Sequence, residues 1–290
     1  MTITLADSAG FCFGVKRAVD TVYRLLEDKE EQVYTLGPII HNEQVVEDLA
    51  SKGVVVVESP KEIMRKTDAK STLVIRSHGV SKEVIDQLQA MQIRYEDATC
   101  PFVKKIHKTV QEYSAKMHRI IIIGSKDHPE VQGILGWANG RGCVIETIQE
   151  AQEFSLEDPN EKLCIVAQTT FNYKKFQDLV EIFSKKGYDI IAVNTICNAT
   201  STRQNEAEEL SARSDAMIVI GGKHSSNSRK LYEICKNQCE NTFFIQTVDD
   251  LKGTSFDSFT SLGITAGAST PNNIIQEVLE ACQKQVLQNY

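Results

Sequence analysis

Three of the eight cysteines stand in turn-forming sequence directly before an expected helix. A helix N-terminus stabilises a thiolate, and the thiolate is the form of cysteine that binds metals. Three thiolates gathered around one point indicate a metal cluster. The three cysteines and their surroundings are Gly10-Phe11-Cys12-Phe13-Gly14, Thr99-Cys100-Pro101 and Cys197-Asn198-Ala199-Thr200.

The number of repeated cysteines bears on the kind of metal. Structural zinc normally recruits a fourth protein ligand, and catalytic zinc favours histidine. A 4Fe-4S cluster held by three cysteines leaves one iron free to bind a substrate. The pattern therefore favours an iron–sulfur centre with one open iron. Of the remaining cysteines, Cys143 and Cys164 are interpreted as small buried residues and Cys282 as incidental. Cys235 and Cys239 stand four residues apart at the end of a helix pattern and could pair on a metal, but two ligands alone are a weak signal.

The cysteines begin three similar stretches of chain, spaced 88 and 97 residues apart. After each cysteine come an amphipathic helix and an apolar strand that ends in glycine, at Gly37, Gly124 and Gly221. A histidine follows each glycine three or four residues later, at His41, His128 and His224. A second strand closes each stretch, and these strands lead to His78, Thr169 and Ser269. His107 and His118 fall within a helix pattern and receive no role.

Two of the strand ends carry groups suited to proton transfer and to phosphate binding. Glu130 follows His128 by two residues and opens a helix, where its carboxyl group is placed to relay a proton to a reduced substrate. Ser225, Ser226 and Asn227 follow the strand that ends at Gly221 and also open a helix. Their amides and hydroxyls suit phosphate oxygens, although the same residues are ordinary helix N-caps.

The elements that position these residues alternate between β-rich runs and helical patterns, which is typical of an α/β protein with parallel sheets. We expect three similar small α/β domains in a pseudo-threefold trefoil, each delivering its cysteine to one centre. The expected domains are residues 13–98, 99–195 and 196–290, with residues 1–12 packing on the third.

Composition narrows the classes of function. Hydrophobic residues make up 41% and charged residues 24%, as in an ordinary globular protein. The net charge of −7 is spread without a basic run, so we expect no nucleic-acid or anionic-membrane partner. No stretch is long and apolar enough for a membrane span, and we expect a cytoplasmic protein. The sequence contains neither a P-loop nor a G-x-G-x-x-G motif, so no nucleotide triphosphatase or nicotinamide site is indicated.

An ordered set of motifs across nearly the whole chain resembles the 4-hydroxy-3-methylbut-2-enyl diphosphate reductase family, which catalyses the terminal step of the methylerythritol phosphate route to isoprenoids. The resemblance implies a trefoil of three α/β domains around an iron–sulfur cluster. The motifs are Gly10-Phe11-Cys12-Phe13-Gly14-Val15, Gly37-Pro38-Ile39-Ile40-His41-Asn42, Arg76-Ser77-His78-Gly79, Asp97-Ala98-Thr99-Cys100-Pro101, His128-Pro129-Glu130-Val131, Gln168-Thr169-Thr170, Asn194-Thr195-Ile196-Cys197, Ser225-Ser226-Asn227 and Ala266-Gly267-Ala268-Ser269-Thr270-Pro271.

The resemblance also implies an activity and a role for each matched residue. The reaction is a two-electron, two-proton removal of an allylic hydroxyl that yields isopentenyl and dimethylallyl diphosphates, with electrons from a ferredoxin or flavodoxin. Cys12, Cys100 and Cys197 hold three irons of a 4Fe-4S cluster, and Glu130 with Thr169 handles the proton. Because Thr169 and Thr170 are adjacent, the sequence leaves open which of them meets the substrate. The residues implied to bind substrate are His41, His78, His128, Thr169, Ser225, Ser226, Asn227 and Ser269.

Two other classes remain open at the level of sequence. A zinc hydrolase can use the same cysteines and histidines, and iron content distinguishes it. A non-catalytic iron–sulfur carrier or sensor normally closes its cluster with a fourth protein ligand, whereas the repeat supplies three.

Overall fold

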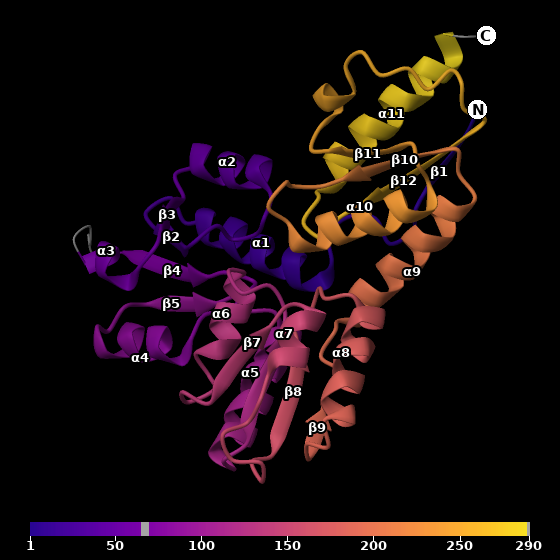
Figure 1. Cartoon of the computed structure of the whole chain (residues 1–290). Helices are drawn as coiled ribbons and strands as arrows, with labels where there is room; N and C mark the ends of the chain where they lie inside the picture. Colours follow the sequence, from indigo (N-terminus) through magenta and orange to yellow (C-terminus); the bar gives the residue numbers. More distant parts are fainter. Residues whose placement is uncertain (65–69, 289–290) are drawn as a thin grey trace. The chain divides into compact units, whose positions relative to one another are not determined.

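The computed structural model describes residues 1–64 and 70–288. Within these ranges the chain forms three four-stranded sheets, and every strand pair is parallel (Figure 1). No helix in this part of the chain has the length and apolar character needed to cross a membrane. The prediction of three similar α/β units with parallel sheets is confirmed.

The described chain divides into two compact units. The first contains residues 1–16, 41–47 and 198–290, and the second contains residues 17–40 and 48–197. One sheet belongs to the first unit and two belong to the second. The predicted domain limits of 13–98, 99–195 and 196–290 stay a prediction.

The sheet of residues 32–97 has the strand order β3-β2-β4-β5. Its strands are β2 (Gln32–Leu36), β3 (Val55–Val57), β4 (Ser71–Ile75) and β5 (Tyr95–Asp97). Helix α1 (Phe13–Leu26) precedes this sheet, and the helices between its strands are α2 (Glu43–Ser51), α3 (Pro60–Met64) and α4 (Lys82–Ala90).

The sheet of residues 119–192 repeats this order as β7-β6-β8-β9. Its strands are β6 (Arg119–Ile123), β7 (Gly142–Ile145), β8 (Leu163–Ala167) and β9 (Ile190–Ala192). Its helices are α5 (Pro101–Ala115), α6 (Pro129–Leu135), α7 (Ile148–Glu153) and α8 (Tyr173–Lys185).

The third sheet, in the first unit, is completed by the N-terminal strand. Its order is β1-β12-β10-β11, because β1 (Thr2–Leu5) pairs with β12 (Ser261–Ala266). The other strands are β10 (Ala216–Ile220) and β11 (Thr242–Ile245). The helical elements are α9 (Asn198–Ala212), α10 (Ser226–Gln238), the 3-10 turn η1 (Val248–Leu251) and α11 (Asn272–Gln288). All three sheets therefore share one topology, with an edge strand directly preceding each cysteine of the repeat.

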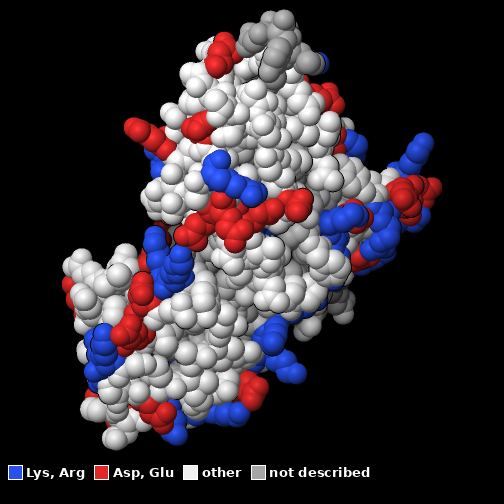
Figure 2. Space-filling model, turned by 90° about the vertical axis from the view of Figure 1, so that its right-hand side faces the viewer, with Lys and Arg blue, Asp and Glu red and all other residues white. Residues whose placement is uncertain are grey.

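Buried β-branched runs explain why the central strands form. In β6 four successive isoleucines are fully buried, as expected for a parallel strand covered on both faces. Ile121 and Ile123 pack with Phe176 and Phe183 of α8 on one face. Ile120 and Ile122 pack on the other face, in a cluster that includes residues of α5 and α6. Acidic and basic side chains are interspersed on the face shown in Figure 2.

His107 lies on the buried side of α5 and is 6% exposed. Its ring stacks on Trp137, with 5.2 Å between ring centroids and an interplanar angle of 17°. Burial lowers the pKa of His107 to about 4, although the carboxylate of Asp97 acts in the opposite direction. The sequence pattern placed His118 in a helix as well. In the structure His118 lies in the connection between α5 and β6.

Acidification is expected to destabilise the folded chain through His107. In the unfolded chain this histidine titrates near 6.5, and in the folded chain near 4. The unfolded state therefore binds more protons between these values, so the contribution is complete above about pH 6.5 and is lost as the pH falls towards 4. The urea midpoint, followed by the fluorescence of the single tryptophan, should fall less steeply with acidification in His107→Gln.

His224→Gln provides the control for this measurement, because the His224 side chain is 78% exposed. It should keep the slope of the unsubstituted protein. Equal slopes for the unsubstituted protein and His107→Gln would show that His107 does not carry the effect.

Candidate active site

Each cysteine of the repeat follows an edge strand and directly precedes a helix. Cys12 precedes α1, Cys197 precedes α9, and Cys100 is the N-cap of α5, whose first residue is Pro101. The three helices begin at the residue directly after each cysteine. All three cysteines are half-buried, and none of them forms a disulfide in the described part of the chain.

A hydrogen bond of the same kind holds each cysteine backbone beside the end of a neighbouring strand. The acceptor is always the carbonyl of the second residue after β12, β4 or β8. The three sheets thus present their cysteines in the same local geometry, at the carboxyl ends of parallel strands where ligands bind in such folds. The N–H groups donate from Cys12 to Ala268 at 3.2 Å, from Cys100 to Ser77 at 2.9 Å and from Cys197 to Thr169 at 3.0 Å.

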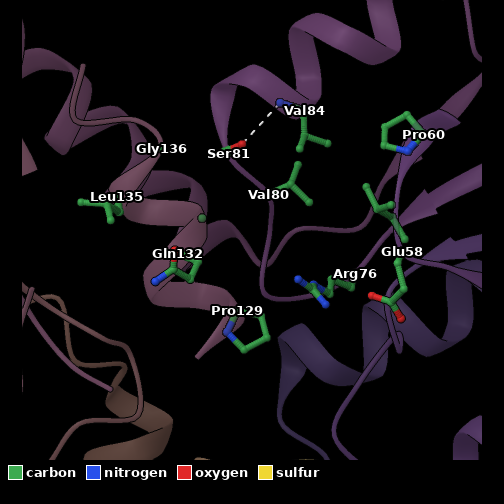
Figure 3. Close-up of a pocket in the computed structure, with 12 residues that line it drawn as sticks. Glu58, Pro60, Arg76, Val80, Ser81, Val84, Pro129, Gln132, Leu135 and Gly136 are labelled. Atoms are coloured by element: carbon green, nitrogen blue, oxygen red, sulfur yellow. Dashed lines mark hydrogen bonds between the residues drawn. The ribbon is translucent and has the colours of Figure 1, made fainter. Parts of the chain in front are cut away.

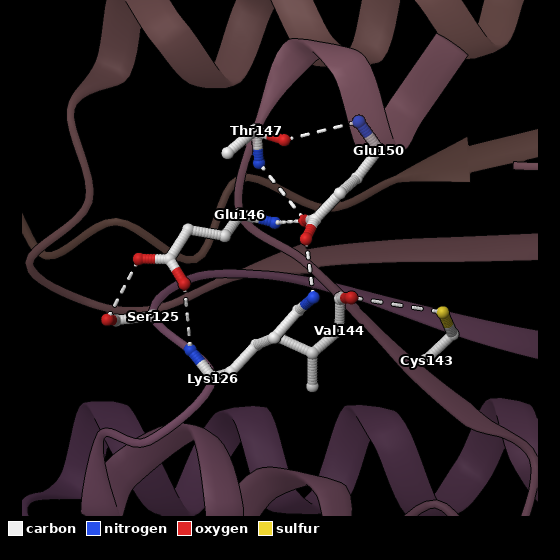
Figure 4. Close-up of polar contacts among 7 residues, drawn as sticks. All are labelled: Ser125, Lys126, Cys143, Val144, Glu146, Thr147 and Glu150. Carbon is white, nitrogen blue, oxygen red and sulfur yellow. Dashed lines mark hydrogen bonds and ion pairs between the residues drawn. The ribbon is translucent and has the colours of Figure 1, made fainter. Parts of the chain in front are cut away.

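The other cysteines have a different environment. Burial raises the pKa of Cys164 and of Cys235 to about 12 and that of Cys282 to about 11. Such thiols stay protonated near neutral pH and are poor metal ligands. Cys143, in β7, donates weakly to the carbonyl of Val144, and burial raises its pKa as well (Figure 4).

Glu130 is buried in the first turn of α6, with 2% exposure, and both carboxylate oxygens are engaged by one residue. The Thr169 N–H donates to Oε1 at 2.6 Å and the Thr169 hydroxyl donates to Oε2 at 2.8 Å. Because Thr169 also accepts the hydrogen bond from Cys197, the carboxyl group is linked through one residue to a cysteine backbone.

His128 is the N-cap of α6. Its Nδ1 accepts from the N–H of Glu130 at 3.1 Å, so a neutral ring carries its proton on Nε2 and offers a donor there. The His78 ring lies edge-on to it, with 5.3 Å between centroids. The second unit therefore brings together Cys100, Cys197, His78, His128, Glu130 and Thr169.

The loop that leads from β6 to His128 is fixed by carboxylates (Figure 4). Glu146 accepts from the Ser125 hydroxyl at 3.0 Å and from the Lys126 N–H at 3.2 Å. Lys126 forms an ion pair with Glu150, which also closes a capping box with Thr147 at the start of α7. These contacts restrict the loop that precedes the histidine.

The first unit collects the hydroxyl and amide groups of the predicted anion site. Ser225 is the N-cap of α10 and accepts from the Ser228 N–H at 3.3 Å. Ser269 donates to the carbonyl of His41 at 3.0 Å. A Cβ at Gly222 would lie only 2.8 Å from that carbonyl, so glycine permits the approach of the His41 backbone. His224 is exposed and does not share the placement of the other repeated histidines.

Asn227 is 4% exposed, yet neither its amide nitrogen nor its amide oxygen has a hydrogen-bond partner among the described residues. Burying such a group without partners is unfavourable. The unsatisfied amide therefore points to a polar ligand beside Ser225 and Ser226.

The strand ends correct one correspondence drawn from residue spacing. By the number of residues after each cysteine, Thr169 corresponds to His78 and Ser269. Counting from the ends of β4, β8 and β12 aligns Thr170 with these residues, because each stands third after its strand. Thr169 instead corresponds to Ser77 and Ala268, the other acceptors of the cysteine hydrogen bonds.

These features define a parallel α/β protein in which one cysteine stands at the carboxyl edge of each of three sheets. The chain belongs to the LytB family, since the family model described as LytB protein matches residues 3–283.

Relatives and solved structures agree with this family. Proteins named 4-hydroxy-3-methylbut-2-enyl diphosphate reductase include those of Caldanaerobacter subterraneus, 45% identical over 97% of this chain and 96% of the relative, and of Thermoanaerobacter sp. X514, 47% identical with the same coverage. The structure of the E-1-hydroxy-2-methyl-but-2-enyl-4-diphosphate reductase from Plasmodium falciparum is similar with a TM-score of 0.90 and 28% identity, over 96% of this chain and 87% of that one.

Replacing Asn227 by leucine is expected to stabilise the ligand-free chain. The substitution removes two unsatisfied buried polar atoms and keeps the branching of the side chain, so the free energy of unfolding should rise by about 1 kcal/mol. Urea unfolding measures the change. Asn42→Leu is the matched control, because Asn42 is also 4% exposed but accepts from the Val45 N–H at 3.1 Å. Losing this hydrogen bond in Asn42→Leu should lower the free energy of unfolding by about 1 kcal/mol. A similar loss in Asn227→Leu would mean that the Asn227 amide is already satisfied.

Proposed function

We propose that this chain reduces 4-hydroxy-3-methylbut-2-enyl diphosphate to isopentenyl and dimethylallyl diphosphates. The reaction breaks the C–O bond of the allylic hydroxyl, consumes two electrons and two protons and releases water. The observation that carries the proposal is the family match over residues 3–283, combined with a cysteine at the same place in each of three sheets.

The cofactor of this proposal is a 4Fe-4S cluster with Cys12, Cys100 and Cys197 as its ligands. The donor set suits it, because these thiols are half-buried and their backbones are held by equivalent hydrogen bonds. The other cysteines Cys164, Cys235, Cys239 and Cys282 are buried in apolar packing. When bound, a cluster with three cysteine ligands supplies the electrons and an open, Lewis-acidic iron.

Glu130 is the proton donor in this mechanism. Its carboxyl group is buried, and Thr169 fixes both of its oxygens, so its orientation is set before substrate arrives. A proton on this carboxyl group can pass to the allylic hydroxyl of the substrate, either directly or through the Thr169 hydroxyl. The protonated allylic hydroxyl then leaves as water. Thr170 stands where His78 and Ser269 stand in the other sheets, and this position suits substrate contact instead.

Neutral donors anchor the diphosphate. The Nε2–H of His128 and the buried Asn227 amide are the two donors best supported by local contacts. Hydrogen bonds to a charged acceptor are stronger than neutral ones, so several such donors hold a diphosphate without a lysine or arginine. The remaining members of the set are His41, His78, Ser225, Ser226 and Ser269.

Electrons come from a separate protein in this proposal, a ferredoxin or flavodoxin, because the sequence contains no motif for a nicotinamide site. The proposed compartment is the cytoplasm, where such carriers and reduced thiols occur together.

Anaerobic reconstitution with iron and sulfide tests the function. The reconstituted protein should contain about four irons and four sulfides, and its electron paramagnetic resonance spectrum after reduction should change when the diphosphate substrate is added. Cys12→Ser, Cys100→Ser and Cys197→Ser should each lose turnover, while the controls Cys235→Ser and Cys282→Ser keep it. Comparable losses in all five variants would refute the ligand assignment. Zinc in place of iron would favour a hydrolase, and a spectrum unaffected by substrate would favour an electron carrier.

Glu130→Gln separates proton transfer from binding. The glutamine side chain keeps the size of glutamate but cannot donate a carboxyl proton, so turnover should fall by about 10²–10⁴-fold while cluster content and substrate affinity persist. Turnover with a reduced electron donor and calorimetric binding measure the two effects. Glu181→Gln, at a carboxylate on α8 that is 62% exposed and pairs with Lys185, is the control and should retain activity. Turnover close to normal in Glu130→Gln would remove Glu130 from the mechanism.

A further inference from the structure

The segment of residues 76–81 between β4 and α4, here called the His78 loop, is held in the second unit by a contact outside the proposed site. The indole Nε1–H of Trp137 donates to the carbonyl of Val80 at 2.9 Å. Trp137 stands two residues after α6, whose N-cap is His128 and whose first turn contains Glu130. This hydrogen bond therefore ties the loop that carries His78 to the helix that carries His128.

The same loop passes directly over the His107 ring of α5. Gly79 has a positive φ of +70°, and a Cβ at this position would lie 2.7 Å from Cε1 of His107 and 2.9 Å from Cγ2 of Thr99. His107 in turn stacks on Trp137. Since α5 begins at Cys100, the stack connects the loop to the helix that follows the cysteine.

The C-cap of α6, Gly136, lies close to the loop because it has no side chain: a Cβ there would lie 2.2 Å from Cβ of Ser81. One turn earlier, Gly133 faces the backbone of Val80, where a Cβ would make an ordinary contact at 3.6 Å. Figure 3 shows Val80 and Ser81 opposite Gly136 and Gln132 of this segment.

Two cavities border the loop. One of about 400 Å³ is lined by Arg76, Val80 and Ser81 together with residues of α6. Another of about 310 Å³ is lined by Val80, His107 and Trp137. On the side of the second cavity, His107 and Trp137 are therefore the residues that border Val80 of the loop.

We infer that Trp137 and His107 are positioning residues that hold the His78 loop at the spacing from His128 required for diphosphate binding. Neither residue belongs to the proposed catalytic or substrate-binding set, and the inference rests on the proposed function for the identity of the ligand. Both residues act through the loop and touch neither the substrate nor the cluster ligands in this account.

Trp137→Phe provides the sharpest test, because it removes the N–H donor and keeps an aromatic ring against His107. The loss of one hydrogen bond should raise amide hydrogen exchange in the His78 loop about three- to tenfold and leave exchange in β8 unchanged. KM for the diphosphate should rise by a similar factor with kcat nearly unchanged, since the contact serves binding and not the chemical step. His107→Gln, which removes the stacked ring, should act in the same direction.

Phe183→Leu is the matched control. Phe183 of α8 is fully buried in the same unit but packs on the opposite face of the β6 sheet from α5 and α6. It should lower Tm at least as much as Trp137→Phe without changing loop exchange or KM.

Each outcome decides part of the inference. Unchanged loop exchange in both variants would overturn the contact itself, and faster exchange with unchanged KM would overturn its role in binding. If the unsubstituted, reconstituted protein does not convert the diphosphate, the proposed function fails, and the exchange measurement alone then decides whether Trp137 and His107 hold the loop.

Discussion

One backbone hydrogen bond, repeated in each sheet, holds every cysteine of the repeat beside the end of a neighbouring strand. The donor is the cysteine N–H, and the acceptor is the carbonyl of the second residue after β4, β8 or β12. Both partners are main-chain groups, so this hydrogen bond does not use the cysteine side chain. The contact is possible because the edge strand before each cysteine pairs in parallel with the strand that carries the acceptor: β5 with β4, β9 with β8 and β1 with β12. In the last of these pairs, β1 comes from the N-terminal end of the chain and β12 from near the C-terminal end.

Close backbone approach is the second requirement, and glycines provide it at specific places. A Cβ at Gly221 or Gly267 would lie 2.2 or 2.0 Å from the hydroxyl of Ser228, whose N–H caps onto Ser225. Side chains larger than glycine would displace the start of α10, where the unsatisfied Asn227 amide lies. Gly79 and Gly136 have the same function around the His78 loop. The polar groups of the site thus depend on residues without side chains.

A chain with a net charge of −7 needs local hydrogen-bond donors to bind an anionic diphosphate. The proposed anchors are imidazole, hydroxyl and amide donors, and none is a lysine or arginine. Neutral donors avoid the desolvation penalty of burying a cation when no ligand is bound. The Asn227 amide still carries a cost in the ligand-free chain, since its two polar atoms are buried without partners among the described residues. Stability is thereby exchanged for a preorganised anion site.

The sequence by itself determined what depends on local order: the parallel α/β class, the three cysteines before helices and the strand-end polar residues. These follow from residue periodicity and turn chemistry, which act over a few positions. Only the tertiary structure decided which residues share a register, so that Thr170, not Thr169, matches His78. It also made Thr169 the partner of Glu130 and placed His107 against the loop that carries His78. Such relations join residues far apart in the chain, and they form only when strands pair and helices pack, which no local pattern records.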